Sequence, residues 1–214
     1  MLALMSKSQT GMNKTRMNKI GNKSAASPLA VDVAARLDQP LALVGLMGSG
    51  KSVLGRRLAK TLDMGFRDSD QQIVKAAGIS IAEIFDLAGE AKFRAMEYTA
   101  LSQIIAEHPQ VIATGGGAFC QQDTAALLLE KTLVVWLKAP PATLLSRIGS
   151  TKSRPLLHGD DPLAVLVKLH EQRAGFYARA QIHLNTDGLS THRATTALLQ
   201  ALDSYLSNLH LSSQ

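Results

Sequence analysis

The segment Gly45–Ser52, with the sequence GLMGSGKS, combines the residue types that a protein uses to hold phosphate, and it matches the pattern G-x-x-x-x-G-K-[ST] in full. Its glycines let consecutive backbone N–H groups converge on phosphate oxygens, and the helix expected from near Gly50 points its positive end at the same anion. Lys51 is placed to reach the outer phosphates, and the Ser52 hydroxyl is placed to ligate Mg²⁺. We therefore expect a nucleoside triphosphate bound by Gly48, Ser49, Gly50, Lys51, Ser52 and Val53.

The rest of the sequence narrows the kind of nucleotide-binding protein. The N-K-x-D pattern with which GTPases read guanine is absent, as is the L-S-G-G-Q pattern of ABC transporter ATPases. The strand expected at residues 111–114 ends without the acidic residue that usually supports the metal in P-loop proteins. A carboxylate must therefore come from a neighbouring strand.

Two carboxylates follow such a strand, in the sequence FRDSD. Asp68 and Asp70 are two residues apart, so a continued strand would put them on one face, whereas a turn would separate them. One carboxylate could support Mg²⁺ through water, and the other could receive the proton of an acceptor hydroxyl. The competing interpretation is an N-cap for a helix that begins at Gln71, a common role for Asp.

Other segments offer charge or an approachable backbone. Arg94 lies four residues after Glu90 and three before Glu97, so both carboxylates could fix its guanidinium, although a solvated ladder of ion pairs would have the same spacing. Gly115–Gly117 end a core strand, where the lack of side chains lets the backbone approach a small ligand closely. Each of these features is weak evidence for a ligand site on its own.

A loop rich in Gly, Ser, Pro and charged residues is expected at 149–161, and it has the composition of a mobile lid. Arg154 in this loop is a candidate cation for the transferring phosphoryl group. On the helix that follows, Arg173 and Tyr177 lie one turn apart.

Short apolar runs alternate with longer helical patterns, which predicts an α/β fold with a parallel sheet of about five strands flanked by helices on both faces. Ligands of such sheets bind at the carboxyl ends of the strands. The strands are expected within residues 41–45, 65–70, 111–114, 133–139 and 182–188. Helices are expected between them, with a break near Gly89, and a last helix from about residue 191.

The charge of the 214-residue chain is concentrated at its N-terminus. Residues 1–30 contain five basic and no acidic residues, whereas the remainder contains 18 basic and 17 acidic ones, so +5 of the net charge of +6 lies in the tail. We expect residues 1–38 to be a basic, disordered extension and residues 39–214 to be the folded domain. The lack of Asp and Glu in residues 1–30 is also typical of an organelle transit peptide. The single cysteine, Cys120, is compatible with the reducing cytoplasm.

The chain resembles the shikimate kinases, a family of P-loop small-molecule kinases, in six motifs that occur in the same order. They are the P-loop, FRDSD, GEAKFRAME at 89–97, GGG at 115–117, RPLL at 154–157 and RAGFYARA at 173–180. The resemblance implies the P-loop kinase fold and the ATP-dependent phosphorylation of the 3-hydroxyl of shikimate, a step toward chorismate and the aromatic amino acids. It also implies ATP and Mg²⁺ as cofactors.

The resemblance also implies roles for individual residues. Shikimate would be held by Asp70, Arg94, Gly115, Gly116, Gly117 and Arg173, and Asp68 would support Mg²⁺ through water beside Ser52. Arg147 and Arg154 would serve the nucleotide or the lid, so that the catalytic groups would be Lys51, Asp70 and Arg154. The chemistry agrees, because two arginines can clamp a carboxylate while a carboxylate and glycine backbone fix ring hydroxyls. Val53 departs from the family, which usually has Thr or Ser there.

Two alternatives stay open. Gluconate also carries a carboxylate and a row of hydroxyls, so a gluconate kinase is the nearest competitor, although the triple glycine and DSD favour shikimate. A kinase-like ligand sensor without turnover would be expected to have lost its P-loop or its acidic pair. We further expect a cytoplasmic monomer that binds neither nucleic acid nor membranes, because the domain is nearly neutral and has no apolar run of about 20 residues.

Overall fold

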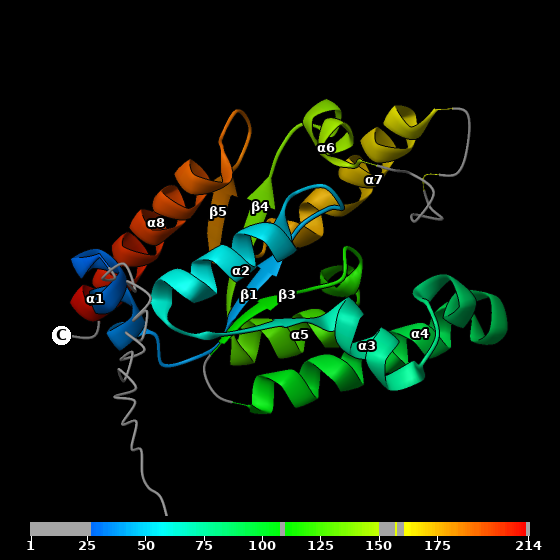
Figure 1. Ribbon diagram of the computed structural model, residues 1–214, viewed down its shortest axis with the longest axis horizontal. Coiled ribbons are helices and arrows are strands. Elements are labelled where there is room, and N and C mark those ends of the chain that lie inside the picture. Colours follow the sequence, from blue (N-terminus) through cyan, green and yellow to red (C-terminus); the bar gives the residue numbers. More distant parts are fainter. Residues whose placement is uncertain (1–26, 108–109, 150–156, 158–160, 213–214) are drawn as a thin grey trace, which may run out of the picture.

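The computed structural model describes residues 27–107, 110–149, 157 and 161–212 (Figure 1). Within these residues one sheet is formed by β1 (Leu41–Val44), β2 (Gly65–Asp68), β3 (Gln110–Ala113), β4 (Leu133–Lys138) and β5 (Ile182–Asn185). The helices are α1 (Pro28–Arg36), α2 (Lys51–Leu62), α3 (Ser69–Ala77), α4 (Ile81–Ala106), η1 (Ala118–Cys120), α5 (Gln122–Lys131), α6 (Pro141–Arg147), α7 (Pro162–Tyr177) and α8 (Thr191–Ser212). The predicted α/β architecture with five strands is confirmed.

All strand pairs are parallel, in the order β2-β3-β1-β4-β5. The chain therefore leaves the central strand β1 toward one edge, forms β2 and β3 there, and then crosses β1 to build β4 and β5. Ligands of such sheets bind at the carboxyl edge beside this change of direction. The P-loop follows β1 and the triple glycine follows β3, so the topology places the two segments side by side.

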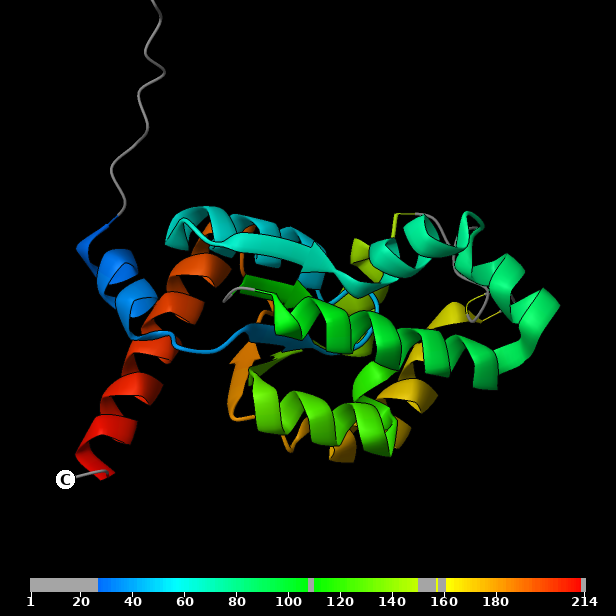
Figure 2. The same cartoon turned by 90° about the horizontal axis from the view of Figure 1, so that it is seen from below.

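Alternation along the strands explains why helices cover both faces of the sheet. Leu41 and Leu43 pack into a core with α1, α2 and α8, while Ala42 and Val44 pack into a second core with α4, α5 and α7. Successive residues of a strand point to opposite faces, so a fully apolar strand must be buried on both sides. Figure 2 shows the sheet between α2 on one side and α5 on the other.

Helix α1 corrects the predicted domain boundary. The disordered extension was expected to reach residue 38, but Pro28–Arg36 are helical, with the Ser27 side chain capping the first turn. Ala30, Val33 and Leu37 are buried against the core of α2 and α8. Figures 1 and 2 both place α1 beside α8. The charge pattern hid this helix because the basic residues of the tail all precede it, while its own Arg36 pairs with Asp32 and Asp203.

Other local predictions concern helix breaks and the lid. Gly89 has φ of 75° and ψ of 174° inside α4, which confirms the break expected there. Pro140 and Pro141 begin α6 as expected. The predicted lid lies mostly outside the described residues, as do residues 1–26 of the predicted extension. None of the described helices is long and apolar enough to cross a membrane.

The attachment of α1 can be tested by comparing two identical substitutions on this helix. Val33 is completely buried, whereas Val31 is 58% exposed. We expect Val33→Ala to lower the free energy of unfolding by about 2 kcal/mol, because it removes two buried methyl groups and leaves a cavity. Val31→Ala should change it by less than about 0.5 kcal/mol. Equal effects of the two substitutions in urea unfolding would contradict the packing of α1 on the domain.

Candidate active site

The P-loop leaves β1 and enters α2 through three glycines in the left-handed region, with φ of 135° at Gly45, 79° at Gly48 and 90° at Gly50. A Cβ atom at Gly45 would lie 2.7 Å from the Leu137 carbonyl oxygen, so a side chain is excluded there by space as well. Gly50 caps α2 without any side-chain hydrogen bond. Gly50 thus places no side chain over the first turn of α2, and the positive end of this helix can bind an anion.

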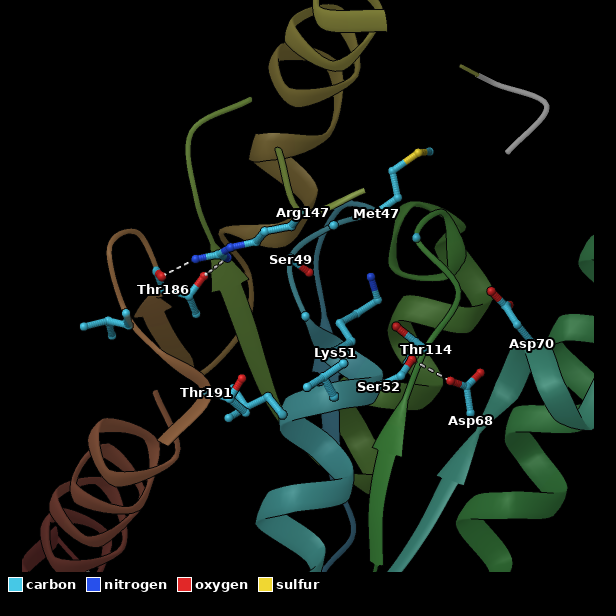
Figure 3. A pocket seen from close by; sticks show the side chains of 16 residues that line it. Met47, Ser49, Lys51, Ser52, Asp68, Asp70, Thr114, Arg147, Thr186 and Thr191 are labelled. Carbon is cyan, nitrogen blue, oxygen red and sulfur yellow. Dashed lines mark hydrogen bonds between the residues drawn. The ribbon is translucent and has the colours of Figure 1, made fainter. Parts of the chain in front are cut away.

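Lys51 lies at the start of α2 with its ammonium group beneath the loop. Its Nζ donates hydrogen bonds to the carbonyl oxygens of Gly45 at 2.8 Å and Leu46 at 3.0 Å. Figure 3 shows the side chain pointing into the pocket. The ammonium group is thus held on the inner side of the loop, where the expected phosphates would bind.

Ser52 and Asp68 meet at the base of the same pocket. The Ser52 hydroxyl donates to Asp68 Oδ2 at 2.7 Å, and Asp68 Oδ1 accepts from the backbone N–H of Gln71 at 3.3 Å. Helix α3 begins at Ser69, so its N-cap is Asp68, and Asp70 lies in the first turn. The turn separates the two carboxylates, which was one of the two predicted possibilities.

The pocket that these residues line has a volume of about 460 Å³. In Figure 3, Arg147 and Thr186 lie on one side, Asp68 and Asp70 on the other, and Lys51 and Ser52 between them. The Arg147 guanidinium donates to the Thr186 hydroxyl at 2.9 Å and to its carbonyl oxygen at 2.6 Å. The other predicted residues that line the pocket are Gly48, Ser49, Gly50, Val53 and Gly116.

Charged side chains approach the triple glycine so closely that an added side chain there would displace them. A Cβ atom at Gly115 would lie 2.7 Å from Asp70 Oδ1 and would also overlap Glu97 Oε1. A Cβ atom at Gly117 would lie 2.8 Å from a terminal nitrogen of Arg94. Neither glycine has a φ in the left-handed region, so what favours glycine here is the position of these charged side chains and not the backbone conformation.

Arg94 is oriented by two carboxylates of its own helix, which is one of the two arrangements that its spacing allowed. It pairs with Glu97 at 2.7 Å and with Glu90 at 3.0 Å. Glu97 is fully buried, and this burial raises the pKa of its carboxyl group despite the opposing charge of Arg94. Burial acts to lower the pKa of Arg94, but the charge and hydrogen bond of Glu97 outweigh it and raise that pKa. The Arg94–Glu97 ion pair is therefore partly buried, unlike the solvent-exposed series of ion pairs that the spacing also allowed.

Helix α7 contributes two donors to the middle glycine. Arg173 Nη1 donates to the Gly116 carbonyl oxygen at 3.1 Å, and the Tyr177 hydroxyl donates to the same oxygen. On the opposite flank, the Gly115 N–H donates to the Ser69 hydroxyl at 3.0 Å. The triple glycine is thus held between α3 and α7, with Gly116 facing the phosphate pocket.

The structure thus brings all the predicted site residues together except Arg154, which lies outside the described residues. Sequence reasoning missed Ser69 and Thr186. Thr186 directly follows β5, and residues that follow parallel strands collect at the ligand-binding edge, so its position was the available signal. Ser69 was the uncharged residue of DSD and carried no comparable signal.

Comparisons with known proteins place the chain in a family. A sequence model described as "Shikimate kinase" matches residues 47–203. The chain is 46% identical to the shikimate kinase of Caulobacter vibrioides over 171 residues, which are 80% of this chain and 86% of that protein. It is also 46% identical to the shikimate kinase of Zymomonas mobilis over 162 residues, 76% and 92% of the two chains. The chain belongs to the shikimate kinase family.

Solved structures agree with this assignment. The shikimate kinase of Acinetobacter baumannii, in complex with shikimate, superposes with a TM-score of 0.76 at 34% identity, covering 80% of this chain and 97% of that one. A gluconokinase from Sinorhizobium meliloti superposes with a TM-score of 0.58 at 17% identity, covering 84% and 99%, which shows a shared fold alone. The family resemblance of the six motifs and the P-loop kinase fold are confirmed.

The need for space at Gly115 can be tested in this shikimate kinase family member with two glycine-to-alanine substitutions. Gly115→Ala must displace Asp70 or Glu97, and we expect turnover to fall by about 10²-fold, as for an error of about 1 Å in the position of a catalytic group. Gly175→Ala in α7, where nothing lies within 4 Å of the added atom, should leave turnover unchanged. Steady-state rates of the two purified variants would decide, and normal turnover of Gly115→Ala would contradict the close packing.

Proposed function

We propose that this protein transfers the γ-phosphoryl group of ATP to the 3-hydroxyl of shikimate, forming shikimate 3-phosphate and ADP on the route to chorismate. The observation that carries the proposal is that the phosphate pocket adjoins the triple glycine. Gly116 and Asp70 line the pocket, and Arg94, Arg173 and two carboxylates approach the triple glycine. Membership of the shikimate kinase family supports this assignment.

On the nucleotide side, the N–H groups at the start of α2 and the Lys51 ammonium group would hold the outer phosphates. Arg147, hydrogen-bonded to Thr186 on the same side of the pocket, would bound the nucleotide on the side away from the acceptor. Arg154 remains a predicted lid cation. Val53, which is 62% exposed in the pocket, offers only its backbone N–H where the family usually has a hydroxyl.

The donor set fits Mg²⁺. Magnesium prefers oxygen ligands and is usually held by one or two carboxylates together with phosphates and waters. Ser52 and Asp68 provide a hydroxyl and a carboxylate 2.7 Å apart, and no group of three His, Cys, Asp or Glu side chains among the described residues could hold a metal by itself. Ser52 would bind the ion directly and Asp68 through water, and the ion would neutralise charge on the phosphates.

On the acceptor side, Arg94 and Arg173 would hold the shikimate carboxylate, while Asp70 and the glycine backbone would fix the ring hydroxyls. The 3-hydroxyl oxygen forms a bond to the γ-phosphorus as the bond to the β,γ-bridging oxygen breaks, and the electron pair leaves with ADP. Asp70 receives the hydroxyl proton. Lys51 stabilises the charge that spreads over the phosphoryl oxygens during transfer.

The acceptor can be established by measuring ADP release from ATP and Mg²⁺ with shikimate and gluconate in parallel. We expect turnover with shikimate and a kcat/KM for gluconate lower by at least about 10³-fold, because a flexible chain does not match the fixed ring geometry that the site must orient. Preference for gluconate would overturn the substrate assignment. Shikimate binding without any ADP release would favour the sensor alternative instead.

The role of Asp70 can be tested with Asp70→Asn, which keeps the shape but cannot accept the proton. We expect kcat to fall by about 10²-fold or more, in the range typical of lost proton transfer. Asp123→Asn is a matched control, because Asp123 lies in the first turn of α5 as Asp70 lies in that of α3. Unchanged kcat and KM in Asp70→Asn would mean that this carboxylate only supports its helix.

Partners and location of the protein remain predictions of the sequence. Shikimate is the small-molecule partner that the proposed function requires. A monomeric cytoplasmic protein that binds neither nucleic acid nor membranes is the accompanying proposal, supported by the near-neutral charge of residues 31–214.

A further inference from the structure

Tyr177 is a residue for which neither the motifs nor the reaction supplies a role, and it is among the most buried large side chains of the described residues, with 1% of its surface exposed. Its ring packs against Trp136 of β4, with the ring centres 5.6 Å apart. Its hydroxyl donates to the carbonyl oxygen of Gly116, the middle residue of the triple glycine. A buried tyrosine needs such a partner, and this one selects a backbone atom of the substrate site.

That hydrogen bond fixes the orientation of the peptide unit between Gly116 and Gly117. The unit is planar and trans, so its carbonyl and its N–H point in opposite directions. With the carbonyl held toward α7, the Gly117 N–H must point away from α7. Without side chains, glycines have little other resistance to rotation of this unit, since their φ and ψ angles are the least restricted.

The Gly117 N–H is the donor that this orientation directs away from α7. Gly117 is buried, yet among the described residues its N–H, like that of the half-buried Gly116, donates to no acceptor, while the N–H groups of Gly115 and Ala118 are bonded to Ser69 and Gly115. Buried backbone N–H groups are rarely left unpaired in native proteins. The guanidinium of Arg94 lies against the same residue, so the open donor is next to a group assigned to the substrate carboxylate.

We propose that Tyr177 is a positioning residue for the acceptor substrate, which holds the Gly116–Gly117 peptide so that the Gly117 N–H remains directed at bound shikimate. The inference rests on the proposed function, because it assumes that the triple glycine receives shikimate. Tyr177 touches neither substrate nor nucleotide in this account and acts only through the backbone.

Arg173 also donates to the Gly116 carbonyl oxygen, at 3.1 Å, but its guanidinium is in addition assigned to the substrate carboxylate, so its position depends on the bound substrate as well. The Tyr177 hydroxyl lies near Arg173 and Cys120 as well, but it is not assigned to the substrate. Burial raises the pKa of its hydroxyl far above the ordinary value of 10, so it stays protonated and remains a donor throughout the neutral range.

The proposal is tested with Tyr177→Phe, which keeps the ring against Trp136 and removes only the hydroxyl. We expect the Kd and KM for shikimate to rise about tenfold, within the range for a lost hydrogen bond to a buried group, while the KM for ATP stays within about twofold. Tyr205→Phe is the matched control, since Tyr205 lies on α8 beside the other core. It should leave both constants unchanged.

Each outcome separates the inference from the proposed function. If the wild-type protein does not bind shikimate, the proposed function itself fails. If it does, a Tyr177→Phe protein with a lowered melting temperature but an unchanged Kd for shikimate would overturn the inference, because Tyr177 would then only stabilise the fold. An equal rise in the KM values for ATP and shikimate would overturn it as well.

A second measurement needs no variant and decides the matter even if Tyr177→Phe is too unstable to assay. In the wild-type protein labelled with ¹⁵N-glycine, the Gly117 amide proton should shift downfield on addition of shikimate as it gains an acceptor. The Gly188 amide, in the turn that follows β5, is the internal reference and should not move. A Gly117 resonance unaffected by saturating shikimate would overturn the proposal.

Discussion

The arrangement of charged side chains in this site depends on glycine having no side chain at positions 115 and 117. Carboxylate oxygens from α3 and α4 lie within 2.7 Å of the place that a Cβ atom of Gly115 would take, and a terminal nitrogen of Arg94 lies 2.8 Å from that of Gly117. Charged groups of opposite sign can therefore converge on one short backbone segment and stay partly shielded from water. This convergence is costly unless the charges are paired, and the bonds of Arg94 to Glu90 and Glu97 provide that pairing.

The parallel sheet joins that segment to the phosphate pocket. Because β1 and β3 are neighbours, the P-loop and the triple glycine leave the same edge of the sheet, and Thr114 ties them together through two hydrogen bonds to the Leu43 carbonyl oxygen. Asp68, at the end of the next strand, reaches Ser52. Donor and acceptor sites thus share one rigid scaffold, which is what in-line transfer between two small molecules requires.

Much of the fold and of the site could be predicted because it depends on short contiguous sequence patterns. The P-loop and the strands are contiguous segments, and the spacing of Glu90, Arg94 and Glu97 follows from helix geometry. The sequence left open whether Asp68 and Asp70 share a face, since their separation depends on α3 starting at Ser69. The role of Tyr177 was equally out of reach, because its partner is a backbone carbonyl 61 residues away. Helix α1 was missed because charge composition outweighed its short apolar pattern.

The central claim is that the triple glycine with Asp70, Arg94 and Arg173 receives the acceptor and the P-loop receives the nucleotide. A crystal structure with shikimate and ADP bound tests it most directly. We expect the shikimate carboxylate to lie between Arg94 and Arg173, a ring hydroxyl to contact Asp70, and that hydroxyl to face the open end of the ADP phosphates. Shikimate bound elsewhere, or with its hydroxyls turned away from Asp70, would contradict it.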